Sequence, residues 1–333
     1  MAFLPAGDRL PDLAKLLSNN SKILLSTTFC LVTSLILHVV FSSAFTLLLK
    51  MAQMRKREHV VTIGAINYIL AAIVAIPVFW MYNPHPAEFG ALWTGGAMGA
   101  TYFIAFFFAI YAIQTVGASS ATVVSVISIC IPVTMAAFFF DEIPSAWQIS
   151  GIVLAMVSLS LISGNRTSFQ KVKPASSSTT NPNDQDDADQ DQTLSPAWLV
   201  PTVLIAFFVL CGMNRVYQEI FKQYQIELHR PAFLLAAFSM AAIPSLVMLI
   251  ARKRWPTQGE LGFGIAVGLC NILQTFFVLK ALEHLKGYVV FTVASAGAIV
   301  LTTLVATLFM GERLSRPAQI GIAISVIALF LLK

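Results

Sequence analysis

Residues 309–322 read FMGERLSRPAQIGI, and residues 140–152 read FDEIPSAWQISGI. Each stretch holds an apolar run, a Glu, a Ser placed to cap a helix, a Gln, and a Gly that opens another apolar run. The repeated motif is marked by Glu142, Gly151, Glu312 and Gly321. Ser145 followed by Gln148 has the spacing of a capping box, which predicts that a helix starts there. The same sequence pattern, repeated far apart in the chain, predicts a duplicated unit.

The composition places this unit in a membrane. Of the 333 residues, 57% are hydrophobic and only 11% are charged, whereas a soluble domain averages about 25% charged residues. Backbone groups must stay hydrogen-bonded inside a bilayer, so spanning segments are helices or closed barrels. Barrel strands alternate apolar and polar residues, but the runs here are apolar on all sides and have the length of a spanning helix. The sequence therefore predicts an all-α integral membrane protein.

Ten spans are predicted, five on each side of a polar segment. They cover residues 27–49, 60–82, 91–113, 118–140, 146–164, 197–221, 231–251, 259–284, 287–310 and 316–332. Residues 165–196 are rich in Ser, Thr and Asp and nearly free of apolar residues, which predicts a disordered acidic linker. Residues 1–26 mix charges with short apolar groups, which predicts an amphipathic tail. The linker separates two five-helix repeats, residues 27–164 and 197–333.

Further pairs of similar segments support the duplication. AIP occurs at residues 75–77 and at 242–244, and FAIYAIQ at 108–114 is answered by FVLKALE at 277–283. Because five is an odd number of spans, the second copy must cross the membrane in the sense opposite to the first. Inverted repeats are a recurrent plan in transporters, with the solute site near the midplane between the halves.

Two five-span repeats, each with a Glu-containing turn before its last helix, resemble the ten-helix drug/metabolite transporter superfamily, of the EamA type. The second turn, GERLSRPAQIG, fits that pattern well, and the first, DEIPSAWQISG, has Asp141 where Gly311 stands in the second. The resemblance implies a permease of a small organic solute in a bacterial inner (plasma) membrane, with no enzymatic activity and no cofactor. The predicted function is a secondary transporter that moves a small polar or amphipathic metabolite by alternating access. The alternative is a non-transporting membrane scaffold or an intramembrane enzyme.

Polar residues within the predicted spans are the candidates for solute binding, because their burial in lipid is costly without a partner or a purpose. Asn214 and Arg215 in span six come first. Arg215 could pair with Glu219 at i,i+4 as a structural ion pair, or face a central cavity and bind a carboxylate or phosphate with its planar fork. A water-accessible cavity reached by Asn214, Arg215 and Gln274 favours transport, whereas a dry core with these groups paired favours the alternative.

The other candidates carry weaker signals. Asn271 and Gln274 share one helix face at i,i+3, where they could bind a ligand or a neighbouring helix. The remaining candidates are Asn67, Tyr68, Tyr102, Tyr111, Lys280 and His38. Lys280 is also explained by snorkelling within a charge cluster, and His38 by a hydrogen bond between helices or by proton coupling. Glu142 and Glu312 fall at the predicted membrane edge, which favours a structural role.

Other partner classes are not expected. The formal net charge of +5 comes from residues that flank the spans, so nucleic acid is not an expected partner, and the expected partners are the bilayer and a small-molecule solute. The four cysteines have no metal-ligand or disulfide spacing, and no metal site or catalytic motif is predicted. Basic residues gather in loops 50–59 and 252–258, which the positive-inside rule places in the cytoplasm with both termini outside. The family resemblance implies termini inside, so the orientation stays open.

Overall fold

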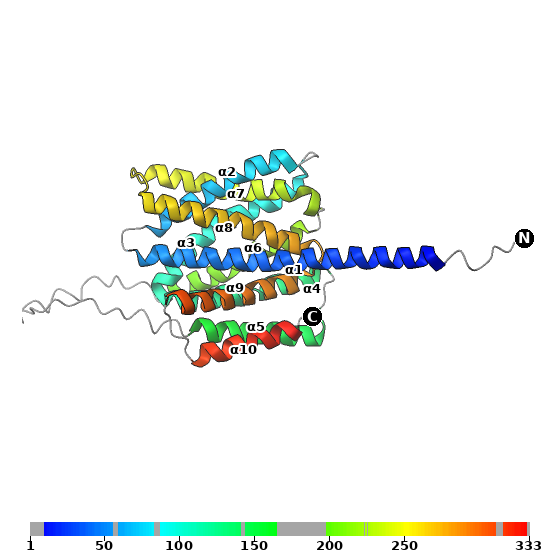
Figure 1. The fold of residues 1–333 in the computed structure, drawn as a ribbon. Coiled ribbons are helices and arrows are strands. Elements are labelled where there is room, and N and C mark those ends of the chain that lie inside the picture. The colour runs from blue at the N-terminus through cyan, green and yellow to red at the C-terminus, as the bar shows by residue number, and fades with distance from the viewer. Residues whose placement is uncertain are drawn as a thin grey trace, which may run out of the picture.

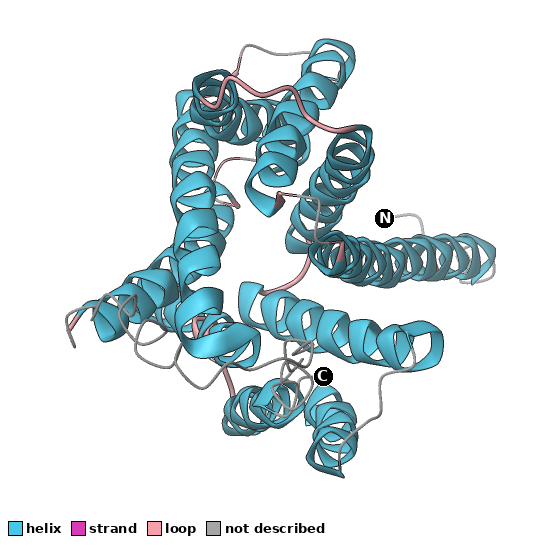
Figure 2. Cartoon of the chain, turned by 90° about the vertical axis from the view of Figure 1, so that its left-hand side faces the viewer, coloured by secondary structure: helices cyan, strands magenta, loops and turns pink. Residues whose placement is uncertain are grey.

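In the computed structural model, helices joined by short turns and loops make up the residues that it describes (Figure 1). These are residues 10–55, 59–82, 87–140, 144–164, 198–222, 224, 226–310 and 316–331. The helices are α1 (Leu10–Met54), α2 (Val60–Tyr82), α3 (Phe89–Ile127), α4 (Cys130–Phe139), α5 (Ala146–Gly164), α6 (Leu199–Phe221), α7 (Ile226–Ala251), α8 (Gln258–Leu282), α9 (Gly287–Met310) and α10 (Arg316–Leu331). The view of Figure 2 runs roughly along the helices and shows them side by side.

Within these described ranges, seven stretches are long and apolar enough to cross a membrane. They lie in α1, α2, α3, α6, α7, α8 and α9, and shorter apolar helices cover Val124–Phe139, Ala146–Ser158 and Gln319–Ala328. Large apolar side chains such as Ile243, Val247 and Phe309 are exposed along the outside, as a surface facing lipid requires. The chain is therefore an integral multi-pass membrane protein, as its composition predicts.

The predicted spans agree closely with several helices. Predicted spans 60–82, 146–164 and 287–310 coincide with α2, α5 and α9. The predicted capping box is present. Ser145 Oγ accepts from the backbone N–H of Gln148 at 3.3 Å, and Gln148 Oε1 accepts from the backbone N–H of Ser145 at 2.9 Å. Helix α1 begins at Leu10, inside the predicted tail. The linker 165–196, Glu142 and Glu312 lie outside the described residues.

Helix α3 contains the predicted third span and part of the fourth, and it is bent. Thr101 bonds to Asn214, and Ser125 bonds to Arg215, the next residue of α6. A straight helix rises about 1.5 Å per residue, so the 24 residues from 101 to 125 would span about 36 Å. Adjacent residues of α6 cannot bridge that distance. Helix α3 is therefore sharply bent between Thr101 and Ser125.

The predicted span 118–140 is not one continuous helix, which corrects the sequence-based expectation. Helix α3 ends at Ile127 and α4 begins at Cys130, with a turn at Ser128 and Ile129. Pro132 has no amide hydrogen to donate to the carbonyl four residues earlier, and its ring crowds that carbonyl. The Ser128 carbonyl instead accepts from the Ile131 amide at 3.1 Å.

Glycines set the closest helix contacts. A Cβ atom on Gly99 of α3 would lie 2.9 Å from the carbonyl carbon of Ala237 on α7 and still nearer to its oxygen. A Cβ atom on Gly268 of α8 would lie 2.9 Å from the carbonyl oxygen of Asn67 on α2. Both glycines belong to small-xxx-small patterns, which allow helix backbones to approach in membranes. The most extensive helix interfaces join α3 to α6 and α7, α8 to α1 and α2, α2 to α7, and α5 to α10.

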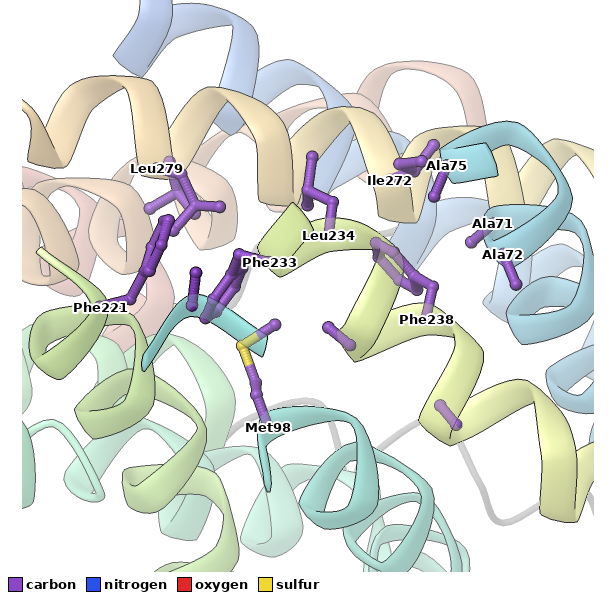
Figure 3. Close-up of a cluster of buried hydrophobic side chains, with 14 of the residues drawn as sticks. Ala71, Ala72, Ala75, Met98, Phe221, Phe233, Leu234, Phe238, Ile272 and Leu279 are labelled. Atoms are coloured by element: carbon purple, nitrogen blue, oxygen red, sulfur yellow. The ribbon is translucent and has the colours of Figure 1, made fainter. Parts of the chain in front are cut away.

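A cluster of buried apolar side chains packs beside these contacts. Phe221 of α6 stacks on Phe233 of α7 with ring centroids 4.2 Å apart. Leu279 of α8 and Met98 of α3 border this pair, and all four side chains are fully buried (Figure 3). The cluster fixes the ends of α6 and α8 close to the polar residues described next.

Candidate solute-binding cavity

A cavity of about 270 Å³ lies among α1, α3, α6, α8 and α9. Five of the residues predicted from the sequence line it: His38, Tyr102, Asn214, Arg215 and Gln274. Tyr102 lies near the centre of the candidate span Phe89–Ile113, which places the cavity at depth in the bundle. The site therefore unites residues from both halves of the chain.

The guanidinium of Arg215 is anchored at one nitrogen. Its Nη1 donates to Ser128 Oγ at 2.7 Å, to the Cys211 carbonyl at 3.3 Å and to the Ser125 carbonyl at 3.4 Å. Ser128 Oγ in turn donates to the Ser125 carbonyl at 2.6 Å, so its lone pairs are available to Arg215. The turn between α3 and α4 thus holds the arginine against the cavity wall.

Arg215 lines the cavity and forms no described ion pair with Glu219. Glu219 pairs with Lys222 at 3.4 Å, and Arg215 has no carboxylate within 4 Å among the residues that the structure describes. An arginine offers five N–H donors in a planar fork. The acceptors described for Arg215 all contact Nη1, so Nε and Nη2 have no described protein acceptor, and the residue lines the cavity.

Amide side chains continue the polar lining. Asn214 Oδ1 accepts from the Thr101 hydroxyl at 2.5 Å. Gln218, one turn further along α6, also lines the cavity, and its amide contacts the sulfur of Met98 at 3.5 Å. The polar face of α6 is thereby ordered by α3 on both sides of Arg215.

A second chain of hydrogen bonds links α2, α8 and α1. Asn271 donates to Asn67 Oδ1 at 3.1 Å, and Gln274 donates to Asn271 Oδ1 at 3.0 Å. His38 contacts the Gln274 carbonyl through Nδ1 at 2.7 Å. A carbonyl can only accept, so Nδ1 carries the hydrogen, and Nε2 of the neutral ring is an acceptor. Asn67 and Asn271 are buried and act between helices, while Gln274 and His38 reach the cavity.

The remaining predicted residues lie elsewhere. Tyr68 is buried and donates to the Tyr102 carbonyl at 3.2 Å, so it supports a cavity residue from behind. Tyr111 lines a separate, apolar pocket between α2, α3 and α6. Lys280 is not among the residues that line the central cavity. Its neighbour Glu283 forms a buried ion pair with Arg230 of α7 rather than a local cluster on α8.

Hydroxyl groups were missed by the sequence analysis. Ser125, Thr275 and Ser295 line the cavity, and Ser128 positions Arg215. Serine and threonine are common in membrane helices, where they bond to the preceding turn, so their presence alone is a weak signal. Thr275, for example, donates to the Asn271 carbonyl at 2.8 Å. The one available signal was the proline at 132, which marks a break in the helix near Ser128.

Polar contacts also close the two ends of the bundle. Glu260, at the start of α8, accepts from the His59 amide at 3.0 Å, the Thr257 amide at 2.8 Å and Arg254 at 2.5 Å. Glu88, just before α3, lies 3.4 Å from His229 near the start of α7. No group of three potential metal ligands occurs in the part of the chain that the structure describes.

The comparisons with known proteins concern both a family and individual chains. Residues 30–164 match the family model described as the EamA-like transporter family. This range runs from α1 to the end of α5 and is consistent with the drug/metabolite transporter superfamily, which confirms the predicted resemblance over these residues. The matched family is one of transporters, not of enzymes.

Two individual proteins are similar to this chain. A Haemophilus influenzae protein (strain ATCC 51907 / DSM 11121 / KW20 / Rd), described as uncharacterized, is 33% identical over 105 residues. That alignment covers 31% of this chain and 36% of the relative. A crystal structure described only as that of a protein superposes with a TM-score of 0.63 at 16% identity, covering 90% of this chain and 98% of the other. At that identity the likeness concerns the fold alone.

Proposed function

We propose that this protein is a secondary transporter that moves a small polar or amphipathic metabolite by alternating access between two inverted five-helix repeats. The observation that carries the proposal is the polar cavity of about 270 Å³ among five helices, lined by Arg215, Asn214 and Gln274. A scaffold has no need to line a cavity at this depth with polar groups, because a polar group within the bilayer costs free energy unless it has a partner or a function.

The ends of the helices support the inverted arrangement. Glu260 bonds to His59, so α8 and α2 begin at the same end of the bundle. Glu88 contacts His229, so α3 and α7 begin at the same end. Helix α3 follows α2 after a short connection and therefore starts where α2 stops. The second helices of the two halves, α2 and α7, thus start at opposite ends.

The pairing of helices supports the same proposal. Each helix of one half can be replaced by its counterpart in the other half, five helices along the chain. The α1–α8 interface then becomes the α6–α3 interface, and the α2–α8 interface becomes the α7–α3 interface; all four are present. The α2–α7 and α5–α10 interfaces map onto themselves. The glycine contacts obey the exchange too, because Gly99 of α3 packs on α7 and Gly268 of α8 packs on α2. Such exchange symmetry is what two inverted copies produce.

The turn at Ser128 and Ile129 gives the proposed movement a location. Discontinuous helices line the solute sites of many transporters, and here the break between α3 and α4 also carries the hydroxyl that holds Arg215. A rotation at this turn would displace the arginine together with its anchor.

Two experiments test the proposal. The first is a solute-uptake screen in proteoliposomes with the wild type and Arg215→Ala, in which wild-type uptake and its loss in the variant are expected. The second uses Cys211, a cavity residue with a free thiol, in a variant with Cys30, Cys130 and Cys270 changed to Ala. A membrane-impermeant thiol reagent should label Cys211 from both sides of oriented vesicles. If the reagent labels Cys211 from neither side, the core is dry and the transport proposal is refuted.

We place the protein in a bacterial inner (plasma) membrane. The relative from Haemophilus influenzae and the helical, rather than barrel, architecture support this location. Fractionation of the producing cell with inner- and outer-membrane markers checks it.

A further inference from the structure

We infer that the cavity binds a small organic monocarboxylate, with the carboxylate on the free edge of Arg215. The inference rests on the proposed transport function for its biological meaning, but it concerns binding and is tested by binding. It is built from the charge, the donor geometry and the size of the cavity.

The charge of the cavity selects an anion with one negative charge. Arg215 is the one permanently charged side chain among the described residues that line the cavity. A carboxylate on the solute neutralises the guanidinium. A doubly charged phosphate ester would leave one negative charge uncompensated at depth in the bundle, and burying an unpaired charge is strongly unfavourable. A cationic solute would face a like charge with no described carboxylate to balance it.

The donor geometry selects a planar anion. Nη1 of Arg215 is occupied by Ser128 and two carbonyls, which fixes the plane of the guanidinium. The remaining Nε–Nη2 edge presents two parallel N–H donors, the arrangement that matches the two oxygens of a carboxylate. Because the anchors hold the plane before the solute arrives, little side-chain entropy is lost on binding.

The size and the other walls define the rest of the solute. A volume of about 270 Å³ corresponds to about nine waters at about 30 Å³ each, which is enough room for a small organic acid of the size of benzoate. Val278, Phe291 and Ala294 contribute apolar surface from α8 and α9. This surface suits a short hydrocarbon or aromatic portion attached to the carboxylate.

The test compares three probes of similar shape on the purified full-length protein in detergent: benzoate, the neutral benzamide and the dianionic phenyl phosphate. Isothermal titration calorimetry measures their affinities. Wild-type protein should bind benzoate at least about tenfold more tightly than either other probe, because benzamide has no charge to pair with Arg215 and phenyl phosphate carries a second charge that the cavity leaves unpaired. Equal affinity for benzamide, tighter binding of phenyl phosphate, or no binding of benzoate would each overturn the inference.

Variants identify the residue responsible. Arg215→Gln should weaken benzoate binding at least about tenfold and leave benzamide unaffected, and Arg215→Lys should fall between because an ammonium lacks the planar fork. Arg252→Gln removes an equal charge from an exposed position after α7 and should bind benzoate as the wild type does. If Arg215→Gln keeps wild-type affinity, the site is elsewhere. If it does not fold, the comparison of probes on the wild type decides.

Transport is scored separately, as protein-dependent counterflow of radiolabelled pyruvate in proteoliposomes. Benzoate binding that depends on Arg215, without counterflow of any solute, would sustain the inference and refute the proposed function. Counterflow of a neutral solute that benzoate does not inhibit would sustain the proposed function and refute the inference.

Discussion

Adding one methyl group to Gly99 should destabilise the protein, whereas the same change at Gly96 should not. Both glycines lie on α3, so the gain in helix propensity from Gly to Ala, about 1 kcal/mol, is common to both variants and cancels in their difference. At Gly99 the new Cβ would lie 2.9 Å from the Ala237 carbonyl carbon and 3.0 Å from Met240 Cβ, while at Gly96 nothing lies within 4 Å. Overpacking of this kind costs about 1–3 kcal/mol.

Thermal unfolding in detergent, followed by tryptophan fluorescence, measures this difference. A cost of 1 kcal/mol lowers Tm by about 2–4 °C in proteins of a few hundred residues, so Gly99→Ala should unfold about 2–12 °C below Gly96→Ala. A Tm for Gly99→Ala equal to or above that of Gly96→Ala would show that α3 and α7 do not approach so closely. Gly268→Ala and Gly262→Ala form the corresponding pair on α8, because a Cβ at Gly262 meets nothing within 4 Å. The inverted-repeat proposal requires a difference of the same sign there.

Three further predictions concern the polar contacts and the broken helix. Glu260→Gln should lower the unfolding free energy by about 1.5–3 kcal/mol, because it weakens charge-assisted bonds to a fully buried group. Arg254→Gln should cost less, because Arg254, which pairs with Glu260, is 42% exposed. A larger loss for Arg254→Gln would contradict the role given to Glu260. Asn67→Leu and Asn271→Leu, made alone and together, should show a coupling free energy of about 0.5–1.7 kcal/mol in a double-mutant cycle of stability, because the two side-chain amides bond to each other. Additive losses of stability would exclude that bond. Pro132→Ala should reduce solute uptake without lowering Tm, because it restores a backbone donor at the proposed hinge; undiminished uptake would remove the hinge from the mechanism.

The sequence predicted the helices best where apolar runs end abruptly. Helices α2 and α9 coincide with the predicted spans because polar or loop residues flank both ends of each run. Residues 118–140 were predicted as a single span because they form one apolar run, and Pro132 within that run indicates a kink but not the turn at Ser128 and Ile129. Hydropathy and periodicity report which residues are buried from water. They contain no information about where a helix bends.

The candidate site was predicted in part for a similar reason. Arg215 and Asn214 stood out because charged and amide groups are costly in lipid, and both line the cavity. Tyr111 and Lys280 stood out by the same criterion but lie away from it, since depth along a span does not determine which way a side chain faces. Ser125 and Ser295 are too ordinary in membrane helices to attract attention. Their convergence depends on packing between distant parts of the chain.

The large interfaces have a consequence for how such a chain can be divided. Helices α1, α2 and α3 find their main partners in α6, α7 and α8, so neither half has a complete set of neighbours of its own. A polypeptide cut between residues 164 and 198 loses none of the described interfaces. Two separately encoded fragments should therefore assemble into a working whole when produced together, whereas either fragment alone would leave the glycine-lined faces of its helices bare to lipid.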